Sequence, residues 1–161
     1  MANNYVQGTI SPCLPLTEAQ VGALGWMRDE LPLEGEEGYE DLTDGEKLSQ
    51  QWAEKYKLEW GTGISVEVDC MSPRRLYYLY AENGLEEGAP EVLQEILQGL
   101  PEEYTHISYE AAAYCSKMRP GEFGGHACFI TRDNIERMST NMWLHKRSVA
   151  TELQKMGEEK E

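Results

Sequence analysis

One short alternating segment most constrains how this chain can fold. Apolar residues occupy every second position from Ile64 to Cys70, and polar residues stand between them. This is the pattern of a strand with one buried and one solvated face. Sheets built from such strands are mainly antiparallel and are covered on one face only. The next segment, 75–81 (RLYYLYA), has strand propensity, so the two segments together predict a hairpin.

Two capping boxes predict helices elsewhere in the chain. Thr17 stands three positions before Gln20, and Thr43 stands three positions before Glu46. In each pair the hydroxyl accepts a free N–H of the first helical turn and the longer side chain reaches back to the cap. Aromatic and apolar residues then recur at every fourth position up to Trp60. We therefore expect the second helix to run to Trp60 and to dock this stripe in the core.

The remaining elements complete an α+β pattern. We predict a first strand over 5–10 that ends in a turn over 11–15, a helix over 90–98, a hairpin of 106–115 with 125–131, and a last helix that starts after Thr140. The expectation is a single domain over 1–161 with a mainly antiparallel sheet and helices on one face. We expect a ferredoxin-like arrangement with an acidic insertion at 29–60, and a tail at 156–161 that frays.

Charge limits the partners that this protein can have. Its 161 residues include 29 Asp and Glu against 14 Lys and Arg, a formal net charge of −15. Nucleic acid and anionic membrane surfaces repel such a protein, so an electrostatically attracted partner is basic. The sequence has no apolar run near the roughly 20 residues that a membrane span needs. We expect a cytoplasmic protein that contacts neither membrane nor nucleic acid directly.

The acidic residues are concentrated in two blocks. Residues 29–46 contain nine acids and no Lys or Arg, and residues 76–116 contain eight acids and no Lys or Arg, whereas 117–147 is mildly basic. A row of carboxylates resembles the phosphates of duplex DNA to a protein that reads phosphates with Lys and Arg. We therefore predict a DNA-mimicking surface for a basic, nucleic-acid-binding protein. Its candidate residues are Glu34, Glu36, Glu37, Glu40, Asp41, Asp44, Glu86, Glu87, Glu91, Glu95, Glu102 and Glu103.

Catalytic and metal-binding motifs are not recognisable in the sequence. The three histidines are far apart, and none belongs to a known nucleophile or zinc signature. The four cysteines form no close pair, so we expect reduced thiols, no metal and no cofactor. The prediction is a protein without catalytic residues. A small metal-dependent enzyme is the less favoured alternative, and it would need His126, Cys128 and acids in one pocket.

A distinctive segment lies between Tyr114 and Gly125. It contains the pattern C-S-x-x-R-P-x-x-F-G-G, and F-I-T at 129–131, M-S-T at 138–140 and W-L at 143–144 follow it. This part of the chain resembles small, mostly uncharacterised proteins encoded by bacteriophages and other mobile elements. In size and acidity the chain is similar to antirestriction DNA mimics. The resemblance implies an inhibitor of host defence, of the anti-CRISPR or antirestriction kind.

The same segment supplies a second candidate surface. Arg119 and Phe123 are its candidate binding residues, although Phe123 can equally pack against the end of the sheet. In this alternative, the protein is an accessory interaction module that acts through the 115–125 hairpin. Its acidity is then incidental.

Overall fold

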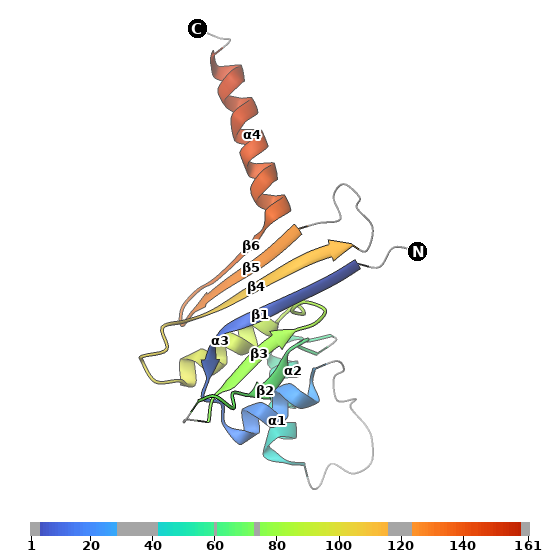
Figure 1. Ribbon diagram of the computed structural model, residues 1–161, viewed down its shortest axis with the longest axis vertical. Helices are drawn as coiled ribbons and strands as arrows, with labels where there is room; N and C mark the ends of the chain where they lie inside the picture. Colours follow the sequence, from blue (N-terminus) through green and yellow to red (C-terminus); the bar gives the residue numbers. More distant parts are fainter. Residues whose placement is uncertain (1–3, 29–41, 60, 73–74, 116–123, 159–161) are drawn as a thin grey trace.

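A six-stranded antiparallel sheet organises the molecule, and three helices lie on one face of it (Figure 1). These are α1 (Glu18–Trp26), α2 (Asp44–Tyr56) and α3 (Ala89–Gly99). The computed structural model describes residues 4–28, 42–59, 61–72, 75–115 and 124–158. The predicted α+β class and mainly antiparallel sheet are confirmed. The elements are β1 (Asn4–Leu14), α1 (Glu18–Trp26), α2 (Asp44–Tyr56), β2 (Ser65–Val68), β3 (Tyr77–Ala81), α3 (Ala89–Gly99), β4 (His106–Cys115), β5 (Gly124–Thr131), β6 (Ile135–Ser139) and α4 (Thr140–Glu158).

The strand order is β2-β3-β1-β4-β5-β6, so the first strand lies in the centre of the sheet. On β1, Ile10 lies opposite Leu79 of β3 on one side and opposite Tyr109 of β4 on the other. Both predicted hairpins are present, as β2 with β3 and β4 with β5. The ferredoxin-like arrangement stays a prediction, because β5 and β6 extend the sheet beyond the first four strands.

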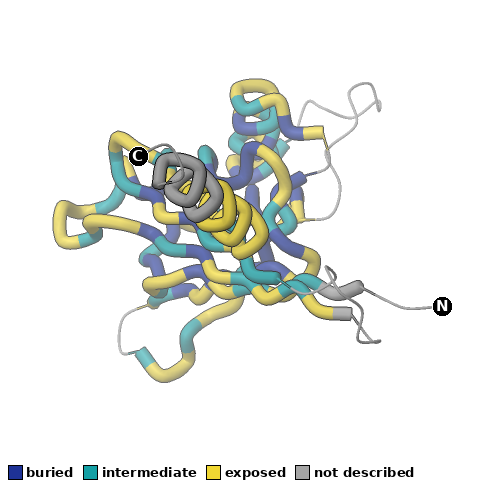
Figure 2. The backbone as a smooth tube through the Cα atoms, turned by 90° about the horizontal axis from the view of Figure 1, so that it is seen from above, coloured by how far each residue is buried: buried dark blue, intermediate teal, exposed yellow. Residues whose placement is uncertain are grey.

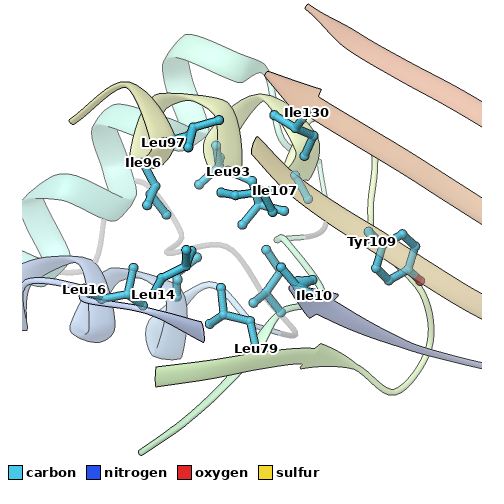
Figure 3. Close-up of a cluster of buried hydrophobic side chains, with 14 of the residues drawn as sticks. Ile10, Leu14, Leu16, Leu79, Leu93, Ile96, Leu97, Ile107, Tyr109 and Ile130 are labelled. Atoms are coloured by element: carbon cyan, nitrogen blue, oxygen red, sulfur yellow. The ribbon is translucent and has the colours of Figure 1, made fainter. Parts of the chain in front are cut away.

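The core lies between the sheet and α3. Ile10, Ile107 and Ile130 point from three strands toward the helix, where Leu93 and Ile96 meet them (Figure 3). These five side chains are 3% exposed or less. Burying an aliphatic side chain of this size contributes about 1.5–3 kcal/mol. This cluster therefore fixes which face of each strand is turned inward.

Both capping boxes form as predicted. The Thr17 hydroxyl accepts the Gln20 N–H at 3.2 Å, and the Thr43 hydroxyl accepts the Glu46 N–H at 3.3 Å. In return, the Glu46 carboxylate accepts the Thr43 N–H at 2.6 Å. These contacts explain why α1 and α2 begin where the sequence indicates.

The predicted end of the second helix is wrong. Helix α2 stops at Tyr56, and Lys57 then adopts a left-handed conformation with φ of 52°. This reversal turns Leu58 into the core, where it is 5% exposed. Burial of Leu58 therefore outweighs the helical periodicity that extends to Trp60, and Trp60 itself lies outside the described residues.

One strand prediction needs correction, and one strand was missed. Strand β1 does not turn at Ser11 but continues to Leu14, because Ser11 pairs with Ser108 and Leu14 pairs with Tyr77. Strand β6 was not predicted at all. Its sequence, IERMS, has little alternation, and it forms at the sheet edge by pairing with β5.

Helix α4 projects from the end of β6, away from the body of the molecule (Figure 1). Its side chains from Thr140 to Ala150 are exposed (Figure 2). The Thr140 hydroxyl accepts the Gly125 N–H at 3.0 Å and holds the base of the helix to β5. Among the described residues, no helix is both long enough and apolar enough to cross a membrane.

Candidate functional site

Several of the predicted site residues lie outside the part of the chain that the structure describes. These residues stay predictions on the sequence alone. They are Glu34, Glu36, Glu37, Glu40 and Asp41 of the acidic block and Arg119 and Phe123 of the 115–125 segment.

The candidate acids of the second acidic block lie before, within and after α3. Glu86 and Glu87 lie in the loop before the helix, and Glu102 and Glu103 lie just after it. All four are exposed, and among the described residues no cation forms an ion pair with them. The 11-residue helix separates the two pairs by roughly 16 Å. Asp44 is also exposed, as the first residue of α2.

Glu95 accepts hydrogen bonds from other residues of the protein. Its carboxylate accepts the Trp52 indole N–H at 3.0 Å and the Lys55 ammonium at 2.7 Å, and it also accepts the Tyr56 hydroxyl. Burial raises the pKa of Glu95, but the hydrogen bonds from Lys55, Tyr56 and Trp52 together outweigh it, so the pKa is lowered. Glu95 therefore ties α3 to α2.

A groove lies where the inner face of the sheet extends beyond α3. We call it the inner groove. It has a volume of about 870 Å³ and lies between the loop that precedes α3, the first turn of α3, and strands β4 to β6. Across these strands Tyr109 is opposite Cys128, and Cys128 is opposite Arg137, so the three side chains form one row. Glu86, Glu87 and Glu91 line the groove on the helix side.

Two polar atoms in the inner groove are buried and have no hydrogen-bond partner. One is Oε2 of Glu91, whose Oε1 accepts the Arg137 guanidinium at 2.5 Å. The other is the hydroxyl of Tyr109, a residue that is only 5% exposed. The backbone amide of Leu85 lies near this hydroxyl, yet makes no hydrogen bond of normal geometry with it. Buried polar atoms normally have partners, so the hydrogen-bonding capacity of these two atoms is left unused.

Gly8 accounts for the position of the Tyr109 ring. A Cβ atom at Gly8 would lie 2.5 Å from the Tyr109 ring and 2.6 Å from the carbonyl oxygen of Glu110. Only glycine therefore allows this ring to lie over β1. The Tyr109 hydroxyl consequently points away from the aliphatic core (Figure 3) and lines the groove.

The inner groove also contains His126 and Cys128, the pair on which the enzyme alternative depends. The Cys128 side chain is buried, and burial raises its thiol pKa, with Arg137 acting in the opposite direction. A thiol that ionises less readily is a weaker nucleophile. No group of three His, Cys, Asp or Glu side chains in the described residues is arranged to hold a metal ion.

The outer face of the sheet carries a second shallow depression, of about 760 Å³. Tyr78 and Tyr80 line it, and both hydroxyls donate to the Glu67 carboxylate. These hydrogen bonds lower the pKa of Glu67, and the same contact raises the pKa of Tyr78 to about 12. The two tyrosine hydroxyls of this depression are thus hydrogen-bonded, in contrast to the Tyr109 hydroxyl of the inner groove.

Sequence reasoning missed Tyr109 and Arg137. For Tyr109 a signal existed, because it lies two positions after Ile107 in a predicted strand and therefore on the same, buried face. For Arg137 there was none, because the strand that carries it was not predicted. Comparison with known proteins adds no further residue: no family model, no curated protein and no solved structure matches the chain.

Proposed function

We propose that this protein is a non-enzymatic inhibitor that binds a basic, nucleic-acid-binding host defence protein of the kind targeted by anti-CRISPR or antirestriction proteins. The observation that carries the proposal is the set of four exposed carboxylates at the ends of α3, namely Glu86, Glu87, Glu102 and Glu103, none of which forms an ion pair with a described cation. Carboxylates left unpaired on a surface are available to a cationic partner.

An acidic surface lowers stability but favours binding to a basic partner. Like charges in this number repel one another and disfavour the compact state, so a net charge of −15 has a cost in stability. Facing a basic surface, the same charges accelerate association and favour the correct partner. Salt screens exposed charges, with a Debye length of about 8 Å at physiological ionic strength. Binding is therefore expected to weaken steeply as salt is added.

A charge-neutralised variant tests the proposal. The variant changes Glu86, Glu87, Glu102 and Glu103 to Gln, and the tagged protein is used to capture its partner from a bacterial host lysate at low and high salt. A matched control changes four other exposed acids to Gln and so has the same net charge. These are Glu54, Glu59, Glu110 and Glu136.

The two variants are expected to behave differently. Capture of a basic protein falls in the first variant and persists in the control, and added duplex DNA displaces the captured protein. Equal capture by both variants contradicts the proposal. Loss of capture on changing Arg119 and Phe123 to Ala, with the acids dispensable, supports the interaction module at 115–125 instead.

A further inference from the structure

We propose that the inner groove receives a cationic side chain, Arg or Lys, of the protein partner. The proposal rests on the function proposed above and deepens it, because it assigns one pocket within the acidic surface. It is carried by two buried acceptors without partners, in a groove whose charge is negative.

The charged groups that line the groove select a cation. Glu86, Glu87 and Glu91 contribute three carboxylates, and Arg137 is the guanidinium among the lining residues. Arg137 is already bonded to Oε1 of Glu91 at 2.5 Å. The excess charge is therefore negative, and an anionic ligand would face Glu86 and Glu87 with its charge uncompensated.

The unpaired atoms define where the cation binds. Oε2 of Glu91 is a carboxylate oxygen with its acceptor capacity free, and the Tyr109 hydroxyl oxygen is a second acceptor in the same groove. An ammonium or guanidinium group donates several N–H bonds at once and accepts none, so it supplies the donors that both atoms lack. Hydrogen bonds to an ionised carboxylate are among the stronger ones in proteins.

The walls of the groove suit the aliphatic part of such a side chain. Met138 and Met142 line one side, and Val6 and Pro90 are also among the lining residues. Arg and Lys bury their methylene stems along apolar surface while the charged end binds polar atoms. The volume of about 870 Å³ exceeds that of one side chain, so the partner's neighbouring residues also enter.

Neighbouring residues hold both acceptor side chains in place. Tyr109 is held over Gly8 by the strand register, and Glu91 is fixed in the first turn of α3 by Arg137. Preorganisation of this kind lowers the entropic cost of binding.

N-Acetyl-arginine amide is the probe for the test, and N-acetyl-citrulline amide is its neutral control of nearly the same shape. Each is titrated into the full-length protein while amide NMR spectra are recorded. We expect the arginine compound to shift the amides of Glu91, Cys128 and Arg137, and the citrulline compound to leave them unchanged. A lysine amide in place of the arginine compound tests the ammonium form of the same chemistry.

Two variants and one control locate the contact. Tyr109→Phe removes only the hydroxyl, and Glu91→Gln removes the charge and replaces one acceptor oxygen by an NH2 donor. We expect affinity for the arginine probe to fall about tenfold or more in each. Glu136→Gln is the control, because Glu136 adjoins Arg137 on β6 but is not among the groove residues. It is expected to bind the probe as the unmodified protein does. Retained dispersion of the spectra shows that each variant is folded.

The outcomes separate this proposal from the proposed function. Equal shifts with the citrulline compound, or unchanged affinity in Tyr109→Phe, overturn the groove proposal, and salt-sensitive capture of a basic protein can still stand. In the opposite case, the probe binds in the groove, and capture is unchanged when Glu86, Glu87, Glu102 and Glu103 are changed to Gln. This result refutes the proposed function of the acidic surface but keeps the cation site.

Discussion

Replacing Glu95 by Ala tests whether this carboxylate holds α2 to α3. Glu95 accepts hydrogen bonds from Trp52, Lys55 and Tyr56. Trp52 is 2% exposed, so without Glu95 its indole N–H becomes a buried donor without an acceptor. Such a donor costs about 1–3 kcal/mol, whereas the half-buried Tyr56 hydroxyl can turn to water.

We therefore expect Glu95→Ala to lower the free energy of unfolding by about 2 kcal/mol. The melting temperature then falls by roughly 4–8 °C in a chain of this length. Glu95→Gln keeps an acceptor for the indole and is expected to lose about half as much. Urea unfolding followed by circular dichroism measures both, and Glu102→Ala, which changes an exposed and unpaired acid, is expected to stay within about 0.5 kcal/mol of the unmodified protein.

The dependence on pH gives a second readout of the same contact. The pKa of Glu95 is lowered from 4.5 in the folded state, so the unfolded chain takes up its proton first as the pH falls. The stability that Glu95 contributes is thus complete above the unfolded pKa and disappears as the pH drops through the folded one. The difference between the unmodified protein and Glu95→Gln is expected to be constant between about pH 6 and 8 and to shrink below about 4.5. A Glu95→Ala variant as stable as Glu102→Ala, or a pH-independent difference, shows that Glu95 does not hold α2 to α3.

Three further predictions concern stability and titration. Gly8→Ala places a Cβ 2.5 Å from the Tyr109 ring and is expected to lower the free energy of unfolding in urea by about 1–3 kcal/mol. Gly25→Ala, in open space on α1, is expected to raise it by about 0.5–1 kcal/mol. An unchanged stability of Gly8→Ala contradicts the close approach. The Arg132 guanidinium donates to the carbonyls of Gln98, Leu100 and Pro101 at 3.0, 2.8 and 3.0 Å. Arg132→Ala removes these donors and is expected to lower the free energy of unfolding by about 2 kcal/mol. An unchanged urea midpoint argues against this cap of α3. Glu67→Gln is expected to bring the pKa of Tyr78 down from about 12 toward 10, seen as phenolate absorbance that develops at lower pH; an unchanged alkaline titration excludes the Glu67 contact in solution.

Local signals in the sequence predicted the starts of the helices and the pairs of neighbouring strands. The capping boxes at Thr17 and Thr43 act within four residues, and both are present in the structure. The alternation from Ile64 onward acts between nearest neighbours, and β2 forms there with β3 as its partner. Features of this kind can be predicted from the sequence because they depend only on residues a few positions apart.

Features that depend on distant contacts were not predictable in the same way. Helix α2 ends early because Leu58 packs close to Gly88, where a Cβ atom would lie 2.4 Å from the leucine side chain. Strand β6 forms because β5 offers it an edge, since its own sequence hardly alternates.

The candidate site was predictable in part. Glu86 and Glu87 were identified from charge alone, and the structure leaves them exposed. The roles of Glu91 and Glu95 were not visible, because they depend on Arg137 of β6 and on Trp52 of α2. Tyr109 joins the groove only once the register of β1, β4 and β5 is known.

Competition with duplex DNA distinguishes a DNA-mimicking protein from one that binds its partner elsewhere. The partner captured by this protein is mixed with a labelled DNA duplex, and the fraction of bound DNA is measured as the protein is added at low and at high salt. We expect the protein to displace the duplex. Displacement is expected to weaken with salt and in the variant with Glu86, Glu87, Glu102 and Glu103 changed to Gln. A partner that binds the protein and the duplex at the same time contradicts DNA mimicry.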